Sequence, residues 1–190
     1  MPKAFPLLAF LFLGAASCAN SETSTSHQMQ TVDSLFDSAV PPQAIDIMNY
    51  TILSTQVAGG GAITAEQVAT LPDKGYTTII NLQFEGEDGV KEEMAAADAA
   101  GLTYVSVPLG GADFALEHAK QVSGAIAASS GHVLLHCRSG GRVSAVWALM
   151  RAIEEGLTPE EAGRVANEEG CRPIPESMVN RVVTELRSAR

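Results

Sequence analysis

The sequence HVLLHCRSGGR, residues 132–142, places a short apolar run directly before a cysteine, two glycines and an arginine. A run of this length and composition is typical of a buried strand in a parallel sheet. The glycines allow a tight turn, and from Arg142 or Val143 to Glu155 the apolar residues have helical spacing. The segment therefore predicts a strand that leads to Cys137, followed by a loop and a helix.

The same alternation of strands and helices extends over the rest of the chain from residue 43. We expect strands at 77–82, 104–107 and 132–135, helices at 64–75, 91–100, 113–128, 142–155, from 158 and at 177–187, an entry strand at 45–54 and a turn at 59–61. This order predicts an α/β domain with a mainly parallel sheet flanked by helices on both faces. In such sheets ligands bind beyond the carboxyl ends of the strands, which is where Cys137 stands.

The composition is that of one domain and argues against polyanionic partners. Acidic residues outnumber basic ones by 22 to 12 among 190 residues, which gives a net charge of −10. A negative field repels nucleic acid and anionic lipid, so we expect no nucleic-acid partner. The three cysteines and four histidines form no CxxC pair and no cluster at metal-ligand spacing, so we expect no metal and no cofactor.

The first residues are typical of an export signal. A basic residue, a short apolar run at 5–13 and small residues before Cys18 predict a signal peptide over residues 1–18. Small residues that end on a cysteine resemble a bacterial lipobox, which predicts that Cys18 is lipidated; ordinary cleavage next to it is the alternative. A polar tether at 19–42 follows, and the domain covers 43–190. We therefore expect an exported, periplasmic protein that is linked to the membrane through an N-terminal lipid.

Cys137 has the sequence surroundings of a reactive thiol. Between a strand and the start of a helix, free backbone N–H groups and the helix dipole stabilise both a thiolate and a bound oxyanion. Arg142 offers a planar fork that can hold two phosphate oxygens. We therefore assign Cys137 and Arg142 to catalysis; the alternative is a buried core cysteine in a plain turn. The substrate-binding candidates belong to the same loop and are Arg138, Ser139, Gly140, Gly141 and Val143.

The run His-Cys-x-Ser-Gly-x-Arg-Val at 136–143 resembles the bacterial protein-tyrosine-phosphatase-like family, in the branch called beta-lactamase-hydrolase-like or dual-specificity-like phosphatases. Thr-Ile-Ile-Asn-Leu, Val-Pro-Leu and Ala-Val-Trp-Ala-Leu segments extend the resemblance over residues 43–181. The resemblance implies a three-layer cysteine-phosphatase fold, a phosphocysteine intermediate on Cys137, phosphate binding by Arg142 and a supporting role for His136. It also implies that the substrate is a phosphorylated protein, with phosphotyrosine, or a small phosphate ester.

Two features depart from the general tyrosine-phosphatase pattern. Four residues instead of five separate Cys137 from Arg142, a spacing that rhodanese-type sulfurtransferases share. Gln83 also stands where the family often has an arginine after Asn-Leu. A sulfurtransferase that carries a persulfide on Cys137 and a catalytically inactive phosphate-binding module are therefore alternative functions.

The proton donor and the second cysteine have two interpretations each. Related phosphatases bring an aspartate from the loop before the helix at 113–128, so Asp113 is the candidate acid; the alternative is an N-cap of that helix. Three carboxylates at 85–89 are further candidates, or simply part of a solvated loop: Glu85, Glu87 and Asp88. Cys171, before the last helix, is either a buried bystander or a disulfide partner of Cys137.

Overall fold

The computed structural model describes residues 40–110 and 113–189. The predicted signal peptide, Cys18 and the predicted tether up to residue 39 lie outside these residues. Over the described ranges, no helix has the length and apolar character needed to cross a membrane.

A five-stranded sheet forms the centre of the domain, in the order β1-β2-β5-β3-β4. Its strands are β1 (Thr51–Ile52), β2 (Val57–Gly60), β3 (Tyr76–Asn81), β4 (Thr103–Ser106) and β5 (His132–His136). Strands β1 and β2 pair antiparallel, and the other pairs of this sheet are parallel. Every residue of β5 is buried, as expected from its apolar sequence. The predicted α/β domain with a mainly parallel sheet is confirmed.

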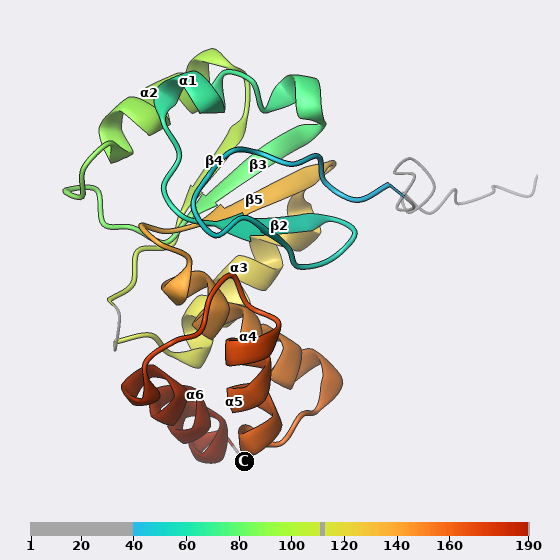
Figure 1. The fold of residues 1–190 in the computed structure, drawn as a ribbon, viewed down its shortest axis with the longest axis vertical. Helices are drawn as coiled ribbons and strands as arrows, with labels where there is room; N and C mark the ends of the chain where they lie inside the picture. Colours follow the sequence, from blue (N-terminus) through green and yellow to red (C-terminus); the bar gives the residue numbers. More distant parts are fainter. Residues whose placement is uncertain (1–39, 111–112, 190) are drawn as a thin grey trace, which may run out of the picture. The chain divides into compact units, whose positions relative to one another are not determined.

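Helices cover both faces of the sheet (Figure 1). The helical elements are α1 (Ala65–Val68), the 3₁₀ turn η2 (Pro72–Lys74), α2 (Val90–Ala99), α3 (Leu116–Ala128), α4 (Gly141–Glu155), α5 (Pro159–Glu168) and α6 (Glu176–Ser188). In Figure 1, α1 and α2 lie above the sheet and α3 to α6 lie below it. The sheet has a buried apolar cluster on each face: Ile79 and Leu134 point into one, and Ile80 and Leu135 into the other. The domain therefore has three layers.

The register of the parallel strands brings their carboxyl ends to one edge. Gly60, Asn81 and His136, the last residues of β2, β3 and β5, lie side by side, and Ser106 at the end of β4 pairs with Asn81. The segments that follow these strands therefore meet at the edge where ligands bind in such sheets. Cys137 is the first residue beyond β5.

The turn predicted at 59–61 is wrong, because Gly59 and Gly60 are the last two residues of β2. Their lack of side chains allows other parts of the chain to pack directly on the strand. A Cβ atom on Gly59 would lie 2.5 Å from the sulfur of Cys171. These glycines therefore mark a close approach to a strand, which is the other common use of glycine in sheets.

Three other predicted elements differ from the observed ones by more than one residue at an end. The entry strand predicted at 45–54 contains only the two residues of β1 in strand conformation. The helix predicted at 64–75 is divided into α1 and η2, because Pro72 lacks the N–H that would continue an α-helix. The helix predicted from Asp113 begins at Leu116, so Asp113 is not its N-cap.

Candidate active site

Cys137 lies at the carboxyl edge of the sheet and is only 1% exposed. Its N–H donates to the carbonyl oxygen of Gly60 at 3.3 Å, which ties the residue to β2. Its sulfur accepts a hydrogen bond from the Gly140 N–H at 3.2 Å. The loop thus curls around the sulfur before α4 begins at Gly141. The thiol consequently lies at the N-terminal end of a helix, where unpaired N–H groups favour a negative charge.

The carbonyl groups of this loop point outward. The Arg138 oxygen accepts from the Ala62 N–H at 3.2 Å, and the Ser139 oxygen accepts from Asn49 Nδ2 at 2.9 Å. In a trans peptide the C=O and the following N–H point in opposite directions. The N–H groups of Ser139 and Gly140 therefore point into the loop, and the second of them is the one that binds the cysteine sulfur. Inward N–H groups are what an anion-binding loop requires.

The two glycines of the loop have different conformations. Gly140 is the N-cap of α4 and has a φ of 86°, a left-handed value that favours glycine. A Cβ atom at this position would also lie 2.8 Å from the Cβ of Cys171. Gly141 is the first residue of α4 and has no positive φ. The conformational freedom that we predicted for both glycines is therefore used at Gly140.

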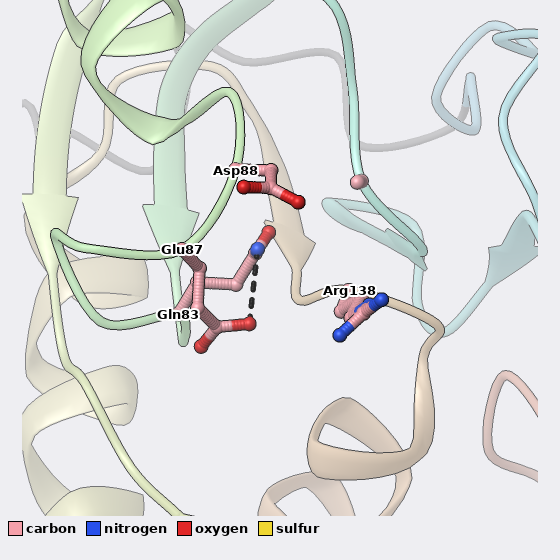
Figure 2. A pocket seen from close by; sticks show the side chains of 5 residues that line it. Gln83, Glu87, Asp88 and Arg138 are labelled. Atoms are coloured by element: carbon pink, nitrogen blue, oxygen red, sulfur yellow. Dashed lines mark hydrogen bonds between the residues drawn. The ribbon is translucent and has the colours of Figure 1, made fainter.

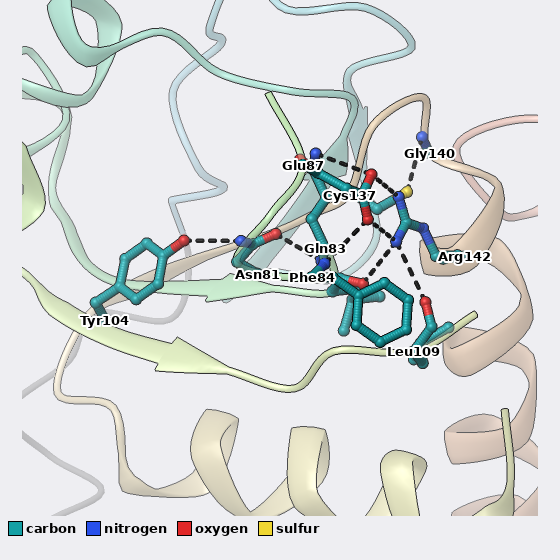
Figure 3. A network of polar contacts seen from close by, with 10 residues as sticks. Asn81, Gln83, Phe84, Glu87, Tyr104, Leu109, Cys137, Gly140 and Arg142 are labelled. Carbon is teal, nitrogen blue, oxygen red and sulfur yellow. Dashed lines mark hydrogen bonds and ion pairs between the residues drawn. The ribbon is translucent and has the colours of Figure 1, made fainter. Parts of the chain in front are cut away.

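Arg142 points from the first turn of α4 toward the loop that follows β3 (Figure 3). Its Nη1 and Nη2 atoms donate to the two carboxylate oxygens of Glu87 at 2.7 and 2.8 Å. Nη1 also donates to the carbonyl oxygens of Leu82 at 2.9 Å and Leu109 at 3.2 Å. The hydrogen bond with Glu87 is the main cause that raises the pKa of Arg142, and the nearby sulfur of Cys137 raises it further. The guanidinium is thus fixed beside the cysteine.

Glu87 is bound from several sides. Besides Arg142, its carboxylate accepts from the Phe84 N–H at 3.0 Å and from Gln83 Nε2 at 3.2 Å. The hydrogen bond from Arg142 lowers the pKa of Glu87 to about 2, although partial burial acts in the opposite direction. A carboxyl group with this pKa is ionised at neutral pH and has no proton to give to a leaving group. In this arrangement Glu87 holds the arginine and is not a candidate proton donor.

Residues 137–140, between β5 and α4, form the cysteine loop. An open pocket of about 320 Å³ adjoins this loop (Figure 2). Its lining residues are Ala62, Gln83, Glu87, Asp88 and Arg138. Asp88 comes with Gln83 and Glu87 from the loop after β3, whereas Arg138 belongs to the loop after β5. Asp88 and Arg138 are both exposed. The entrance of the site therefore combines one cationic wall with one anionic wall.

Asp113, the predicted acid, is not among the residues that line this pocket. It is exposed, and one of its carboxylate oxygens lies 2.9 Å from the position that a Cβ on Gly110 would take. Gly110 directly follows Leu109, whose carbonyl oxygen binds Arg142. Asp113 therefore lies near the segment that holds the arginine, while Asp88 lies in the pocket itself.

The other two predicted binding residues, Val143 and Ser139, differ in what they present to the site. Val143 is fully buried in the core below the sheet, so its side chain does not face a substrate. Its backbone N–H, in the first turn of α4, is the part that an anion can reach. The hydroxyl of Ser139 lies 3.4 Å from Nη1 of Arg172, a second exposed arginine beside the loop.

His136 is held by a buried glutamate that was not among the predicted site residues. Its Nε2 atom lies 2.8 Å from Oε1 of Glu93, and the two side chains are 0% and 2% exposed. A signal for Glu93 does exist in the sequence. Helical spacing places it on the same face of α2 as the buried Val90 and Ala97, and a glutamate on an apolar face needs a buried partner.

Cys137 and Cys171 are both free thiols and both are buried. Cys171, in the loop between α5 and α6, packs against Gly59 and Gly140. Burial, and to a lesser extent the charge of Cys137, raise the pKa of Cys171 to about 12. Within residues 40–110 and 113–189, no group of three or more His, Cys, Asp or Glu side chains could hold a metal ion.

Comparisons of the sequence identify relatives of the chain. Residues 49–154 match the family described as "Beta-lactamase hydrolase-like protein, phosphatase-like domain". The Beta-lactamase hydrolase-like protein of Xylella fastidiosa (strain Temecula1) is 31% identical over 127 residues, which are 65% of this chain and 30% of that protein. The chain thus spans less than a third of the length of the curated relatives that it matches.

Solved structures share the fold at low sequence identity. A DUF442 protein of Shewanella putrefaciens CN-32 has a TM-score of 0.59 and 20% identity, covering 76% of this chain and 94% of that one. P. aeruginosa TpbA, in a complex with pTyr, has a TM-score of 0.56 and 20% identity, covering 80% and 91%. These neighbours confirm the cysteine-phosphatase fold. Since the family match covers more than half of the residues and includes the whole cysteine loop, the chain belongs to the family of Beta-lactamase hydrolase-like phosphatase-like domains.

Proposed function

We propose that the chain is a cysteine-dependent phosphatase that hydrolyses a phosphate monoester through a phosphocysteine intermediate. The observation that carries the proposal is the common position of three groups: the Cys137 sulfur, the inward N–H groups of Ser139 and Gly140, and the Arg142 guanidinium. Phosphoryl transfer to sulfur needs a thiolate, an anion cradle and a cation that binds phosphate oxygens.

In the first step, the Cys137 thiolate attacks phosphorus, so that the S–P bond forms and the P–O bond to the leaving alcohol breaks. The loop N–H groups and Arg142 stabilise the negative charge of the phosphoryl oxygens. The leaving oxygen takes a proton from an acid, for which Asp113 is our candidate and Asp88 the alternative. In the second step, water attacks phosphorus, the S–P bond breaks, inorganic phosphate leaves and the thiolate is restored.

The contact with Glu87 is compatible with phosphate binding by Arg142. Glu87 occupies the edge of the guanidinium formed by Nη1 and Nη2. The edge formed by Nε and the second hydrogen of Nη2 remains for phosphate oxygens, because guanidinium presents five N–H donors in two forks. The carboxylate therefore orients the arginine without replacing the substrate.

We propose an aryl phosphate as the substrate, either phosphotyrosine on a protein or a small ester. Support comes from P. aeruginosa TpbA, whose structure with pTyr shares the fold of this chain. The net charge of −10 supports a substrate with few other negative charges, because a polyanion is repelled before it reaches the loop.

The test is hydrolysis of para-nitrophenyl phosphate by the purified full chain in the presence of a chelator and a thiol reductant. We expect turnover by the wild type and none above background by Cys137→Ser, because every covalent step uses the sulfur. A radiolabelled phosphoenzyme should be trapped by acid in the wild type. Retained hydrolysis in Cys137→Ser would contradict the mechanism. Faster sulfur transfer from thiosulfate to cyanide would assign the sulfurtransferase reaction, and phosphate binding without turnover would assign an inactive binding module.

We further propose that the protein is exported and anchored in the membrane through a lipid on Cys18. Support comes from the basic, apolar and small residues that precede this cysteine. Cys18→Ala should move the full chain from the membrane fraction to the soluble fraction of a bacterial host. An unchanged distribution would indicate ordinary cleavage or another tether.

A further inference from the structure

The buried pair of His136 and Glu93 takes no part in the steps above. The burial of an imidazole and a carboxylate side by side needs an explanation. The Nε2 and Oε1 atoms are 2.8 Å apart at 0% and 2% side-chain exposure. Burial of a carboxylate is unfavourable unless partners satisfy it. A single hydrogen bond between Nε2 and Oε1 satisfies one polar atom of each side chain.

Glu93 also connects to the neighbouring strands. Tyr104 of β4 is close enough to Glu93 to be influenced by it: burial, together with the charge of this carboxylate, raises the pKa of Tyr104. Asn81 Nδ2, at the end of β3, donates to the Tyr104 hydroxyl at 2.8 Å, and Asn81 Oδ1 accepts from the Gln83 N–H at 2.8 Å. Figure 3 shows Tyr104, Asn81 and Gln83 in sequence along this network.

The network continues to the arginine of the site. The side chain of Gln83 donates to Glu87 at 3.2 Å, and Glu87 binds both terminal nitrogens of Arg142. At its other end the network reaches His136, the residue directly before Cys137. Glu93 is therefore the point at which the strand that carries the nucleophile is joined to the loop that orients the phosphate-binding cation.

We infer that Glu93 is a positioning residue of the phosphatase reaction, acting through His136 on the cysteine loop and through Tyr104 and Asn81 on the arginine. The inference rests on the proposed function. The backbone supports it, because the carbonyl oxygen of His136 accepts from the Leu82 N–H at 2.9 Å, and the Leu82 carbonyl oxygen accepts from Arg142. A shift of His136 therefore displaces both the sulfur and the partner of the arginine.

The experiment compares Glu93→Ala, Glu93→Gln and Tyr104→Phe in the full chain, with the exposed Glu92→Gln on the same helix as the matched control. In Glu93→Ala we expect kcat per folded molecule for para-nitrophenyl phosphate to fall on the order of 100-fold, the loss that a small displacement of reacting groups produces. Glu93→Gln should recover most of this loss, because its amide oxygen still accepts from His136. KM should change less than kcat, because the misplaced sulfur slows the chemical step, whereas the shifted Arg142 weakens phosphate binding to a smaller extent.

A purely structural role predicts a different result. Wild-type kcat in folded Glu93→Ala, with only a lower melting temperature, would overturn the inference. Equal losses in Glu93→Ala and Glu93→Gln would also overturn it, since the effect would then follow the charge and not the hydrogen bond. If Glu93→Ala does not fold, Tyr104→Phe decides: a kcat below that of the wild type supports the inference, and wild-type kcat in this variant would overturn it.

A second measurement separates this inference from the proposed function. Mass spectrometry can follow the alkylation of Cys137 by iodoacetamide and its protection by inorganic phosphate, neither of which needs turnover. If the wild type hydrolyses no aryl phosphate, the proposed function fails, but weaker phosphate protection of Cys137 in Glu93→Ala than in Glu92→Gln would still support positioning by Glu93. Equal protection in the two variants would overturn it.

Discussion

The loop after β5 and the loop after β3 meet at the same edge of the sheet but contribute to the site in opposite ways. The loop after β5, residues 137–140, holds a buried sulfur through a hydrogen bond from its own backbone. The loop after β3, residues 82–89, is largely exposed, and its contribution is the carboxylate of Glu87 on Arg142, a partner 55 residues away in sequence.

The comparison shows that the conformation of the cysteine loop and the orientation of the Arg142 side chain have different causes. The shape of the cysteine loop follows from local features, namely the left-handed Gly140 and the start of α4. The orientation of Arg142 depends on a tertiary contact, because an arginine side chain has many rotamers and a carboxylate selects one of them. Substitutions in the two loops should therefore have different consequences, and the following predictions rank them.

The largest effect is expected for Arg142→Lys, which tests whether the cysteine loop needs a fork and not merely a positive charge. Lysine cannot bind Glu87 and phosphate through two edges. We expect kcat/KM for para-nitrophenyl phosphate to fall by about 100- to 1,000-fold, as for the loss of an oxyanion-stabilising donor. Arg164→Lys, at an exposed position on α5, is the control and should keep wild-type activity. A loss below threefold in Arg142→Lys would refute the assigned role.

The second effect decides whether the loop after β3 supplies the acid in addition to the orienting carboxylate. If Asp113 is the acid, Asp113→Asn should lower kcat by about 100-fold for phenyl phosphate, whose leaving group needs a proton, and much less for a better leaving group such as nitrophenol. Asp88→Asn should then leave this dependence unchanged. The reverse result would assign the acid to Asp88 and make the loop after β3 the source of both carboxylates.

The third effect concerns the contact between the two loops. We expect Glu87→Gln to lower kcat/KM by about tenfold, equivalent to about 1.4 kcal/mol of transition-state stabilisation. Glu85→Gln, at an exposed position of the same loop, should have no effect. A gain of activity in Glu87→Gln would show that the carboxylate competes with phosphate and does not orient the arginine.

The same pair also has a predictable dependence on pH. The pKa of Glu87 is lowered from about 4.5 to about 2, so its contribution to stability is complete above about pH 4.5 and is lost as the pH falls toward 2. In urea titrations, the wild type should therefore be more stable than Glu87→Gln at pH 7, and this difference should shrink between pH 4.5 and pH 2. A constant difference across this range would mean that ionisation of Glu87 is not the cause.

The sequence predicts what is encoded locally and misses what depends on contacts across the sheet. The buried strand before Cys137 and the loop that leads into α4 follow from an apolar run and two glycines. The same reasoning misassigned Gly59 and Gly60 as a turn, because these glycines leave space for tertiary contacts: Gly59 for Cys171, more than 100 residues further along the chain, and Gly60 for Ile47. The roles of Glu87 and Glu93 also required tertiary partners, Arg142 and His136, that no spacing in the sequence identifies.

The smallest effect is expected at Cys171, which packs beneath the cysteine loop without contributing charge to it. Peroxide should oxidise the Cys137 thiolate to a sulfenic acid and release water, which stops turnover until a thiol reductant restores the sulfur. For Cys171 to form a disulfide in this step it would have to attack as a thiolate, yet burial raises its pKa to about 12, so it remains protonated at neutral pH. We therefore expect Cys171→Ala and the wild type to recover to within about twofold of each other. Recovery that is lost only in Cys171→Ala would contradict this prediction and assign Cys171 to the protection of the catalytic sulfur.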